Sequence, residues 1–176
     1  MDIITQLVER CREDDRQAQF EIYQKYSKAM YNIALRMVRD SDEAQDVLQD
    51  AFIAAFKSIK TYNGTATFGA WLKRIVINKC LDFLKKRKLD IVDVESVMYK
   101  IEAPETEADD AVFYGVSAEL VHHEIKKLPA GCRVIFNMYL LEGYDHQEIA
   151  SVLEISESTS KSQYSRAKRL LRERLA

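Results

Sequence analysis

Cationic side chains, which could neutralise a phosphate backbone, are concentrated in two blocks of the sequence. Residues 73–88 carry seven Lys or Arg against one acid, and residues 161–174 carry six against one. Between these blocks, residues 90–110 hold eight Asp or Glu against a single Lys. The formal net charge of -2 therefore conceals two strongly basic segments separated by an acidic one. This asymmetry is typical of proteins that bind nucleic acid.

The second basic block lies on a predicted helix over about residues 158–175, with hydroxyl side chains at its start. Hydroxyls and free N–H groups at a helix N-terminus can hold a phosphate. The short segment HQEIASVL and a break at residues 154–156 precede this helix, which is the helix-turn-helix layout. The side chains expected to reach the bases and backbone of a major groove are Ser158, Thr159, Lys161, Ser162, Gln163 and Arg166. The alternative is a solvated helix that is merely amphipathic.

The first basic block lies on another predicted helix, over about residues 67–87, which also carries aromatic rings. Phe68 and Trp71 are followed by Lys73, Arg74 and Asn78, and a lysine-rich end follows. Bases of opened, single-stranded DNA can stack on rings while cations hold the phosphates. Taken alone the pattern is a weak indication, because Phe68 and Trp71 at such positions are more often residues of the hydrophobic core.

Carboxylates line one face of a third predicted helix, over about residues 42–58. Glu43, Asp46 and Asp50 stand at positions i, i+3 and i+7, with Gln49 beside them. General acid–base chemistry is not indicated, because no His, Lys or metal ligand accompanies them at useful spacing. The face is either simply solvated or a docking surface for a basic partner, and the second reading fits the other segments better.

The elements that position these side chains are predicted to be helices throughout. The chain has only 5 Gly and 2 Pro, so turns are scarce and an all-α fold is expected. In the front half, apolar spacing indicates helices over about residues 3–11, 16–38, 42–58 and 67–87. Asp14 and Gln17 are expected to form a capping box, and Phe20 is expected to face the core.

Two small helical domains are expected, at residues 1–88 and 117–176, the second containing the helix-turn-helix. An acidic, flexible linker is expected at residues 89–116, where apolar periodicity is lost. The second domain is predicted to begin with helices over about residues 117–128 and 130–142. Leu141 is expected to face inward at the end of the latter.

Composition and motifs argue against several other classes of protein. No apolar run is long enough to span a membrane and the N-terminus lacks a signal-peptide layout, so a cytoplasmic protein without membrane insertion is expected. Cys11, Cys80 and Cys132 are far apart and read as buried thiols rather than metal ligands. The three histidines, His122, His123 and His146, do not provide a metal site either. No metal, cofactor or enzymatic activity is expected.

Three segments together resemble bacterial RNA polymerase sigma factors. DEAQDVLQDAFIAAFKSI (42–59) resembles their core-polymerase-binding segment, and FGAWLKRIVINKCLDFLKKRK (68–88) their promoter-melting segment. Residues 128–175 resemble their -35-binding domain. The three follow one another in the family's order and cover nearly the whole chain. The short length, with only a linker between the two domains, looks like the extracytoplasmic-function (ECF) group.

The resemblance implies roles for particular residues. Asp46, Gln49 and Asp50 stand where such factors dock on the polymerase β′ coiled coil. The loop 61–67, with Tyr62 and Asn63, stands where they capture a flipped-out base of the -10 element. The residues implied along the non-template strand are Lys73, Arg74, Asn78 and Lys79. Those implied at the -35 element are Lys161, Ser162, Gln163 and Arg166. The implied partners are core RNA polymerase, through its β′ coiled coil and β flap, promoter DNA and an anti-sigma protein.

Three residues depart from the family pattern. Glu154 occupies a turn position that often holds Gly, so a strained left-handed residue or a different turn is expected. Ser160 replaces an apolar residue, which is expected to loosen packing. Gln163 stands where Arg is common, and a Gln would favour adenine over guanine.

Two other classes of protein stay open at this point. One is a free-standing helix-turn-helix regulator. The other is an enzyme such as a nuclease, although the sequence shows no clustered catalytic residues to support it.

Overall fold

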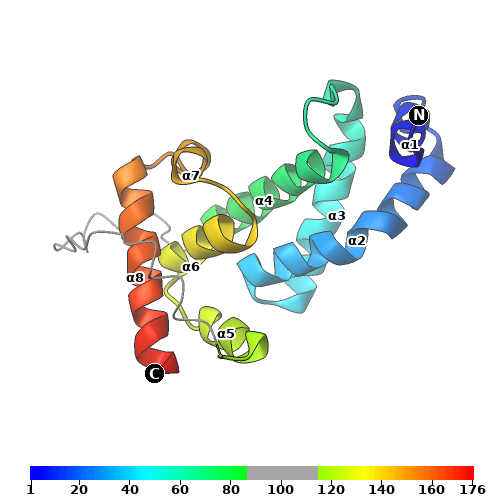
Figure 1. Cartoon of the computed structure of the whole chain (residues 1–176). Helices are drawn as coiled ribbons and strands as arrows, with labels where there is room; N and C mark the ends of the chain where they lie inside the picture. The colour runs from blue at the N-terminus through cyan, green and yellow to red at the C-terminus, as the bar shows by residue number, and fades with distance from the viewer. Residues whose placement is uncertain (87–114) are drawn as a thin grey trace. The chain divides into compact units, whose positions relative to one another are not determined.

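The computed structural model of the chain describes residues 1–86 and 115–176 (Figure 1). The described residues contain helices and no strand, which confirms the predicted all-α fold. They fall into two compact units, one on each side of residue 87. Residues 89–114, the greater part of the predicted acidic linker, lie outside the described residues.

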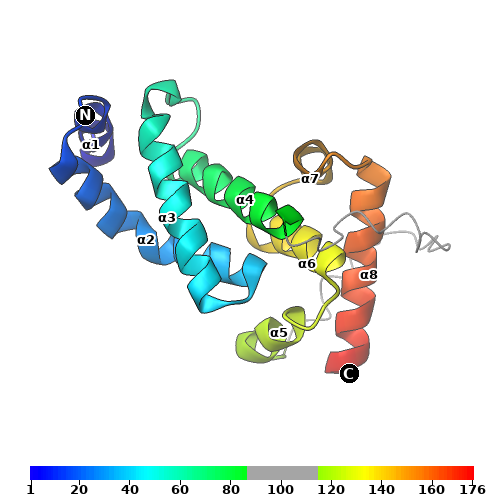
Figure 2. The ribbon, with the colours of Figure 1, turned by 180° about the vertical axis from the view of Figure 1, so that it is seen from behind.

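Four α-helices and one short 3₁₀ turn form the front unit. In chain order they are α1 (Ile3–Arg12), α2 (Arg16–Val38), α3 (Ser41–Lys57), η1 (Ile59–Thr61) and α4 (Phe68–Lys86). Helices α2, α3 and α4 pack against one another, and α1 packs against α2 (Figure 2). The buried side chains at their centre include Ile22, Leu48, Leu72, Ile77 and Leu84. Each predicted front helix is present, with ends within about two residues of the expected ones.

Aspartate side chains begin the first three of these helices. The carboxylates of Asp2, Asp15 and Asp40 accept hydrogen bonds from backbone N–H groups in the first turns of α1, α2 and α3. The predicted capping box at Asp14 is wrong by one residue. Asp14 instead adopts a left-handed conformation, with φ of 60°, that closes the turn after α1, so the next residue becomes the cap.

Phe20 does not face the core, contrary to expectation. Its neighbours Ala18 and Ile22 are both fully buried, while Phe20 is 52% exposed. Because successive helical residues are about 100° apart, a residue two positions from a buried one points to the opposite side. The core contact of this part of α2 is therefore made by the smaller Ala18 and by Ile22.

The second unit is built on one long helix. Helices α5 (Ala118–Ile125), α6 (Ala130–Phe136) and α7 (His146–Leu153) each pack on α8 (Glu157–Leu175) (Figure 1). A π-helical turn, η4 (Asn137–Leu141), extends α6. This turn adds a residue to the helical repeat and shifts the register. The predicted inward position of Leu141 is wrong, since its side chain is 36% exposed.

The turn between α7 and α8 has the left-handed residue expected from the sequence. Glu154 ends α7 with φ of 57° and ψ of 43°. A residue with a Cβ pays about 1–2 kcal/mol for this conformation, whereas Gly adopts it freely.

Glu154→Gly is therefore expected to stabilise the second unit. The gain should be roughly 0.5–1 kcal/mol, because the relief of strain is partly offset by the greater freedom of Gly in the unfolded chain. Urea unfolding of the whole chain, followed by far-ultraviolet circular dichroism, measures the change. Glu148→Gly, inside α7, is the control and should destabilise by a similar amount. A Glu154→Gly variant as unstable as the control would contradict the strain at this turn.

Candidate nucleic-acid interface

The start of α8 is fixed by a serine cap. The Ser156 hydroxyl accepts a hydrogen bond from the Thr159 N–H at 3.0 Å and lies 2.7 Å from the Thr159 hydroxyl. The exposed face that follows carries Ser158 and Lys161, with Ser162 half-buried beside them. Lys161 forms an ion pair with Glu157 at 3.2 Å, and both side chains are about half exposed. Such a pair contributes little, so Lys161 can exchange it for a phosphate at small cost.

Two of the side chains predicted to contact DNA lie on the buried side of α8. Thr159 is 8% exposed and Gln163 is 5% exposed. Their burial argues against base reading by Gln163, and with it against the expected preference for adenine. The exposed face instead continues to Arg169, which sequence reasoning did not select, and Arg166 lies half-buried at its edge.

Ser160 is fully buried and its hydroxyl is paired, so the expected loosening of packing is not seen. Its oxygen lies 2.8 Å from Nδ1 of His146, at the start of α7. The His146 ring stacks on Tyr139, with centroids 4.4 Å apart. The two helices of the helix-turn-helix are therefore joined by a satisfied polar contact among aromatic rings.

The predicted DNA-contacting residues of α4 divide between different sides of that helix. Arg74 and Asn78, four residues apart, are both exposed and share one face. Lys73 and Lys79 are half-buried and lie on other sides. Phe68 is 3% exposed and belongs to the core, while Trp71 is half-buried. Phe68 and Trp71 were expected either to stack on bases or to fill the core. For Phe68 the core interpretation is correct.

The loop between η1 and α4 is held by its own side chains. The Tyr62 hydroxyl donates to the Ala66 carbonyl at 2.6 Å. The Asn63 side-chain oxygen accepts from the backbone N–H and the hydroxyl of Thr65, at 3.0 and 2.8 Å. Gly64 supplies the positive φ of 78° that this tight turn requires. The loop is therefore ordered before any ligand arrives.

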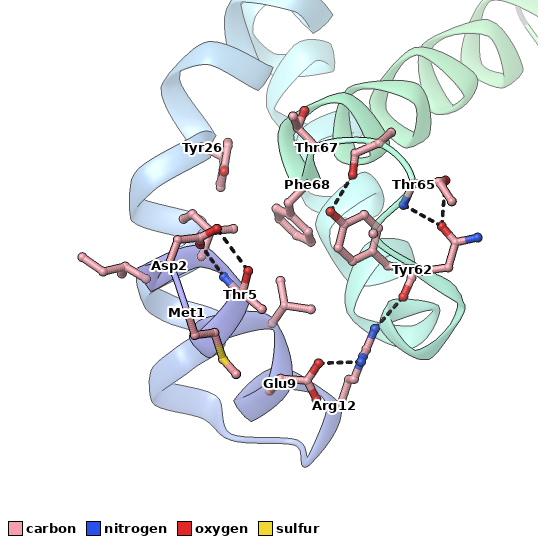
Figure 3. Close-up of a pocket in the computed structure, with 16 residues that line it drawn as sticks. Met1, Asp2, Thr5, Glu9, Arg12, Tyr26, Tyr62, Thr65, Thr67 and Phe68 are labelled. Atoms are coloured by element: carbon pink, nitrogen blue, oxygen red, sulfur yellow. Dashed lines mark hydrogen bonds and ion pairs between the residues drawn. The ribbon is translucent and has the colours of Figure 1, made fainter.

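A pocket of about 1030 Å³ opens between this loop and helix α1 (Figure 3). The two predicted loop residues, Tyr62 and Asn63, both line it. The Phe68 ring, which lines it, packs edge-on against Tyr62, at 5.6 Å between centroids, and at a tilt against Tyr26, at 5.5 Å. Burial raises the pKa of Tyr26 above its ordinary value. Sequence reasoning missed Tyr26 and the residues of α1, which stand far from the loop along the chain.

The acidic face predicted on α3 is exposed. Asp46, Gln49 and Asp50 all lie in solvent on the same side of the helix. Ile53, one turn after Gln49, is 54% exposed on that side, an apolar residue that the sequence did not single out. Charged groups around an exposed apolar side chain are a common arrangement in protein-docking surfaces.

The remaining chemistry-bearing groups of the described residues offer no second site. No group of His, Cys, Asp and Glu in these residues could hold a metal ion. Cys11, Cys80 and Cys132 are buried as predicted. Burial raises the pKa of the Cys11 thiol to about 11 and raises that of Cys132 as well, so neither is reactive at neutral pH. No helix in the described parts of the chain is long and apolar enough to cross a membrane.

Known families and relatives match both units. The sigma-70 region 2 family matches residues 22–89, and the sigma-70 region 4 family matches residues 118–171. The RNA polymerase sigma-H factor of Pseudomonas aeruginosa is 30% identical over 93% of this chain and 89% of its own. The chain belongs to the ECF group of sigma factors. The ECF sigma factor SigW of Bacillus subtilis is 28% identical to this sigma factor over 98% of the chain and 97% of its own.

Solved structures agree with this sigma factor in fold. The structure of CnrH in complex with the cytosolic domain of CnrY has a TM-score of 0.58 and 21% identity, over 99% of this chain and 97% of that one. The sigma factor RpoE of Bartonella quintana, in complex with the anti-sigma factor NepR, has a TM-score of 0.58 and 22% identity, over 88% and 96%.

Membership of the family decides between the function classes left open by the sequence. Sigma factors are transcription initiation factors, and the two matched regions are those that bind core RNA polymerase and promoter DNA. This sigma factor binds core polymerase and directs promoter-specific initiation through the -10 and -35 elements. A free-standing helix-turn-helix regulator is not favoured, because the match includes region 2 as well as region 4.

Proposed function

We propose that the α3 face docks the sigma factor on core polymerase, that α4 and the adjoining pocket open the -10 element, and that α8 reads the -35 element. This division of roles rests on the surfaces that the front unit presents. This unit presents the exposed acidic residues Asp46 and Asp50 on α3, an aromatic-lined pocket between α1 and the loop before α4, and the exposed Arg74 and Asn78 on α4. The groove-reading helix belongs to the other unit. Docking and melting thus occur in one unit, and duplex anchoring in the other.

The pocket supports capture of an unpaired base. Its volume of about 1030 Å³ exceeds the size of one nucleobase, and the half-buried rings of Tyr62 and Tyr26, both packed on the buried Phe68, offer stacking surfaces. The exposed cations of α4 attract the sugar-phosphate backbone of the same strand. An ordered loop reduces the entropy lost when the base enters.

The domain limits follow the same division: residues 1–88 for the region 2 domain, 89–116 for the linker and 117–176 for the region 4 domain. The polymerase, rather than the linker, sets the spacing between the two promoter elements, because about 28 residues of extended chain would allow many separations. Docking uses the β′ coiled coil for the front unit and the β flap for the second.

An anti-sigma protein is proposed as a further partner, supported by the complex of the Bartonella sigma factor with NepR. It would keep the factor inactive by covering the polymerase-binding and DNA-binding surfaces. The sigma factor acts without enzymatic activity of its own. It works in the cytoplasm, because its polymerase partner does.

Salt dependence of -35 binding tests the role of α8. If the second unit neutralises about five phosphates, the slope of log K against log salt should be near -4 to -5. Fluorescence anisotropy of a labelled -35 duplex, titrated with the sigma factor at several salt concentrations, measures the slope. A binding constant that does not change with salt concentration would contradict phosphate binding by α8.

Permanganate footprinting tests the role of the front unit. Holoenzyme assembled from core polymerase and this sigma factor should make thymines of the -10 element reactive, because an unstacked base is open to oxidation. Core polymerase alone is the control and should leave them protected. Holoenzyme that binds a promoter but leaves every thymine protected would contradict melting by the front unit.

A further inference from the structure

Helix α1 forms one wall of the pocket in the front unit. The cavity is lined on this side by Asp2, Thr5, Val8, Glu9 and Arg12, from the helix and its cap. Figure 3 shows Glu9 and Arg12 pointing from α1 toward the loop. All of this wall lies before residue 22, where the match to sigma-70 region 2 begins. The pocket is therefore completed by residues that the family match does not include.

One side chain ties this wall to the loop. The Arg12 guanidinium donates from Nη2 to the carbonyl oxygen of Tyr62 at 2.5 Å, across 50 positions of sequence. Its Nη1 donates to the Glu9 carboxylate at 2.6 Å, one turn earlier on α1. The ion pair orients the guanidinium plane, so Arg12 reaches the loop from a fixed direction. Only 31% of the Arg12 side chain is exposed.

The hydrogen bond from Arg12 to Tyr62 restrains the loop at its first residue. Tyr62 is the first loop residue after η1, and its hydroxyl holds Ala66 near the other end. The Arg12 bond thus holds the Tyr62 carbonyl at one end of the segment 62–66, and the Tyr62 hydroxyl holds the Ala66 carbonyl at the other. Removing the bond would free backbone and ring rotations that the loop must lose again when it closes on a ligand.

We propose that Arg12 is a positioning residue for the -10 pocket, holding loop 62–67 against α1 in the shape that accepts one unpaired base of the non-template strand. This inference rests on the proposed function of the pocket. It adds that the base preference at this position depends on a residue of α1 that does not itself touch the base.

The test compares Arg12→Ala with the parent holoenzyme in binding labelled non-template oligonucleotides that cover the -10 element. Four oligonucleotides differ only in the base at the captured position. Arg12→Ala should weaken binding of the preferred oligonucleotide about tenfold, the effect of one lost hydrogen bond to a charged group. It should also flatten the preference among the four bases. Arg12→Lys, which retains one charged donor, should recover part of both.

Arg10→Ala is the matched control. Arg10 also lies on α1, but it pairs with Asp15 at 2.8 Å and Glu21 at 3.8 Å, and it does not line the pocket. Its replacement should leave the base preference unchanged. Hydrogen exchange of the free protein gives a second readout, because loop amides at 63–67 should exchange about tenfold faster in Arg12→Ala than in Arg10→Ala. If Arg12→Ala fails to fold, Arg12→Lys decides by the same two measurements.

The outcomes separate this inference from the proposed function. If Arg12→Ala binds with parental preference and parental loop exchange, the positioning role is wrong while the pocket stands. If the parent holoenzyme shows no preference at any position of the oligonucleotide, the pocket itself is wrong. The Trp71 ring, 5.4 Å from Tyr62, belongs to the chain's single tryptophan, so in the free sigma factor its fluorescence reports whether the loop moves in Arg12→Ala.

Discussion

Changing Asp46 and Asp50 together to Lys is expected to lower affinity for core polymerase about a thousandfold. Each reversal puts a cation where a basic partner surface would meet an anion, at a cost of about 2 kcal/mol per site. Both carboxylates are exposed on one face of α3, and Lys is a good helix former, so the fold should not change. Fluorescence anisotropy of the labelled sigma factor, titrated with core polymerase, measures the affinity.

The matched control for this variant is Glu173→Lys. It makes one such acid-to-Lys reversal, half the change of charge of the double variant, at an exposed position in the last turn of α8, outside the proposed docking face. Core binding should stay within about twofold of the parent, because a single exposed charge contributes little. The double variant should still bind a -35 duplex at the parental level. Equal loss in both variants would indicate a general electrostatic effect, and the α3 face would lose its assigned role.

Arg166→Ala is expected to weaken -35 binding by about five- to a hundredfold while core binding stays at the parental level. The range corresponds to the loss of one good base or phosphate contact, about 1–3 kcal/mol. Binding of the variant to a set of duplexes, each with one changed base pair, shows which kind of contact was lost. A base contact would relax specificity at one position, whereas a phosphate contact would weaken all duplexes equally.

Arg174→Ala provides the comparison within the same helix. Arg174 lies two turns after Arg166, about 12 Å further along α8, and its side chain is exposed. Its replacement should change -35 affinity by less than about threefold, as expected for a charge at the edge of a binding surface. If the two variants weaken binding equally, α8 attracts DNA only by its overall charge, and Arg166 makes no specific contact with the -35 element.

Helix positions could be predicted from the sequence because two local signals agree. Apolar residues repeat with the helical period, and Asp or Ser stands before the helices as an N-cap. Errors arose where the outcome depends on one residue of register. The cap of α2 is Asp15 rather than Asp14, and the π turn at 137–141 rotates Leu141 outward.

The candidate site could be predicted only in part. Asp46 and Asp50 were correctly expected on a common exposed face, because side chains of one helix follow its period. The burial of Gln163 was not predicted, because which side of α8 is buried depends on how α6 and α7 pack against it. The wall of α1 was missed for a similar reason. Contacts such as Arg12 with Tyr62 join residues 50 positions apart, and no local pattern indicates them.

Transcription with purified components tests the central claim that this chain gives core polymerase its promoter specificity. Core polymerase, freed of its own sigma factor, is combined with this protein and a library of promoters, and the transcript starts are sequenced. Discrete starts that share one -10 and one -35 sequence, absent without the protein, are predicted. Transcripts with the same scattered starts in the presence and absence of the protein would contradict the account.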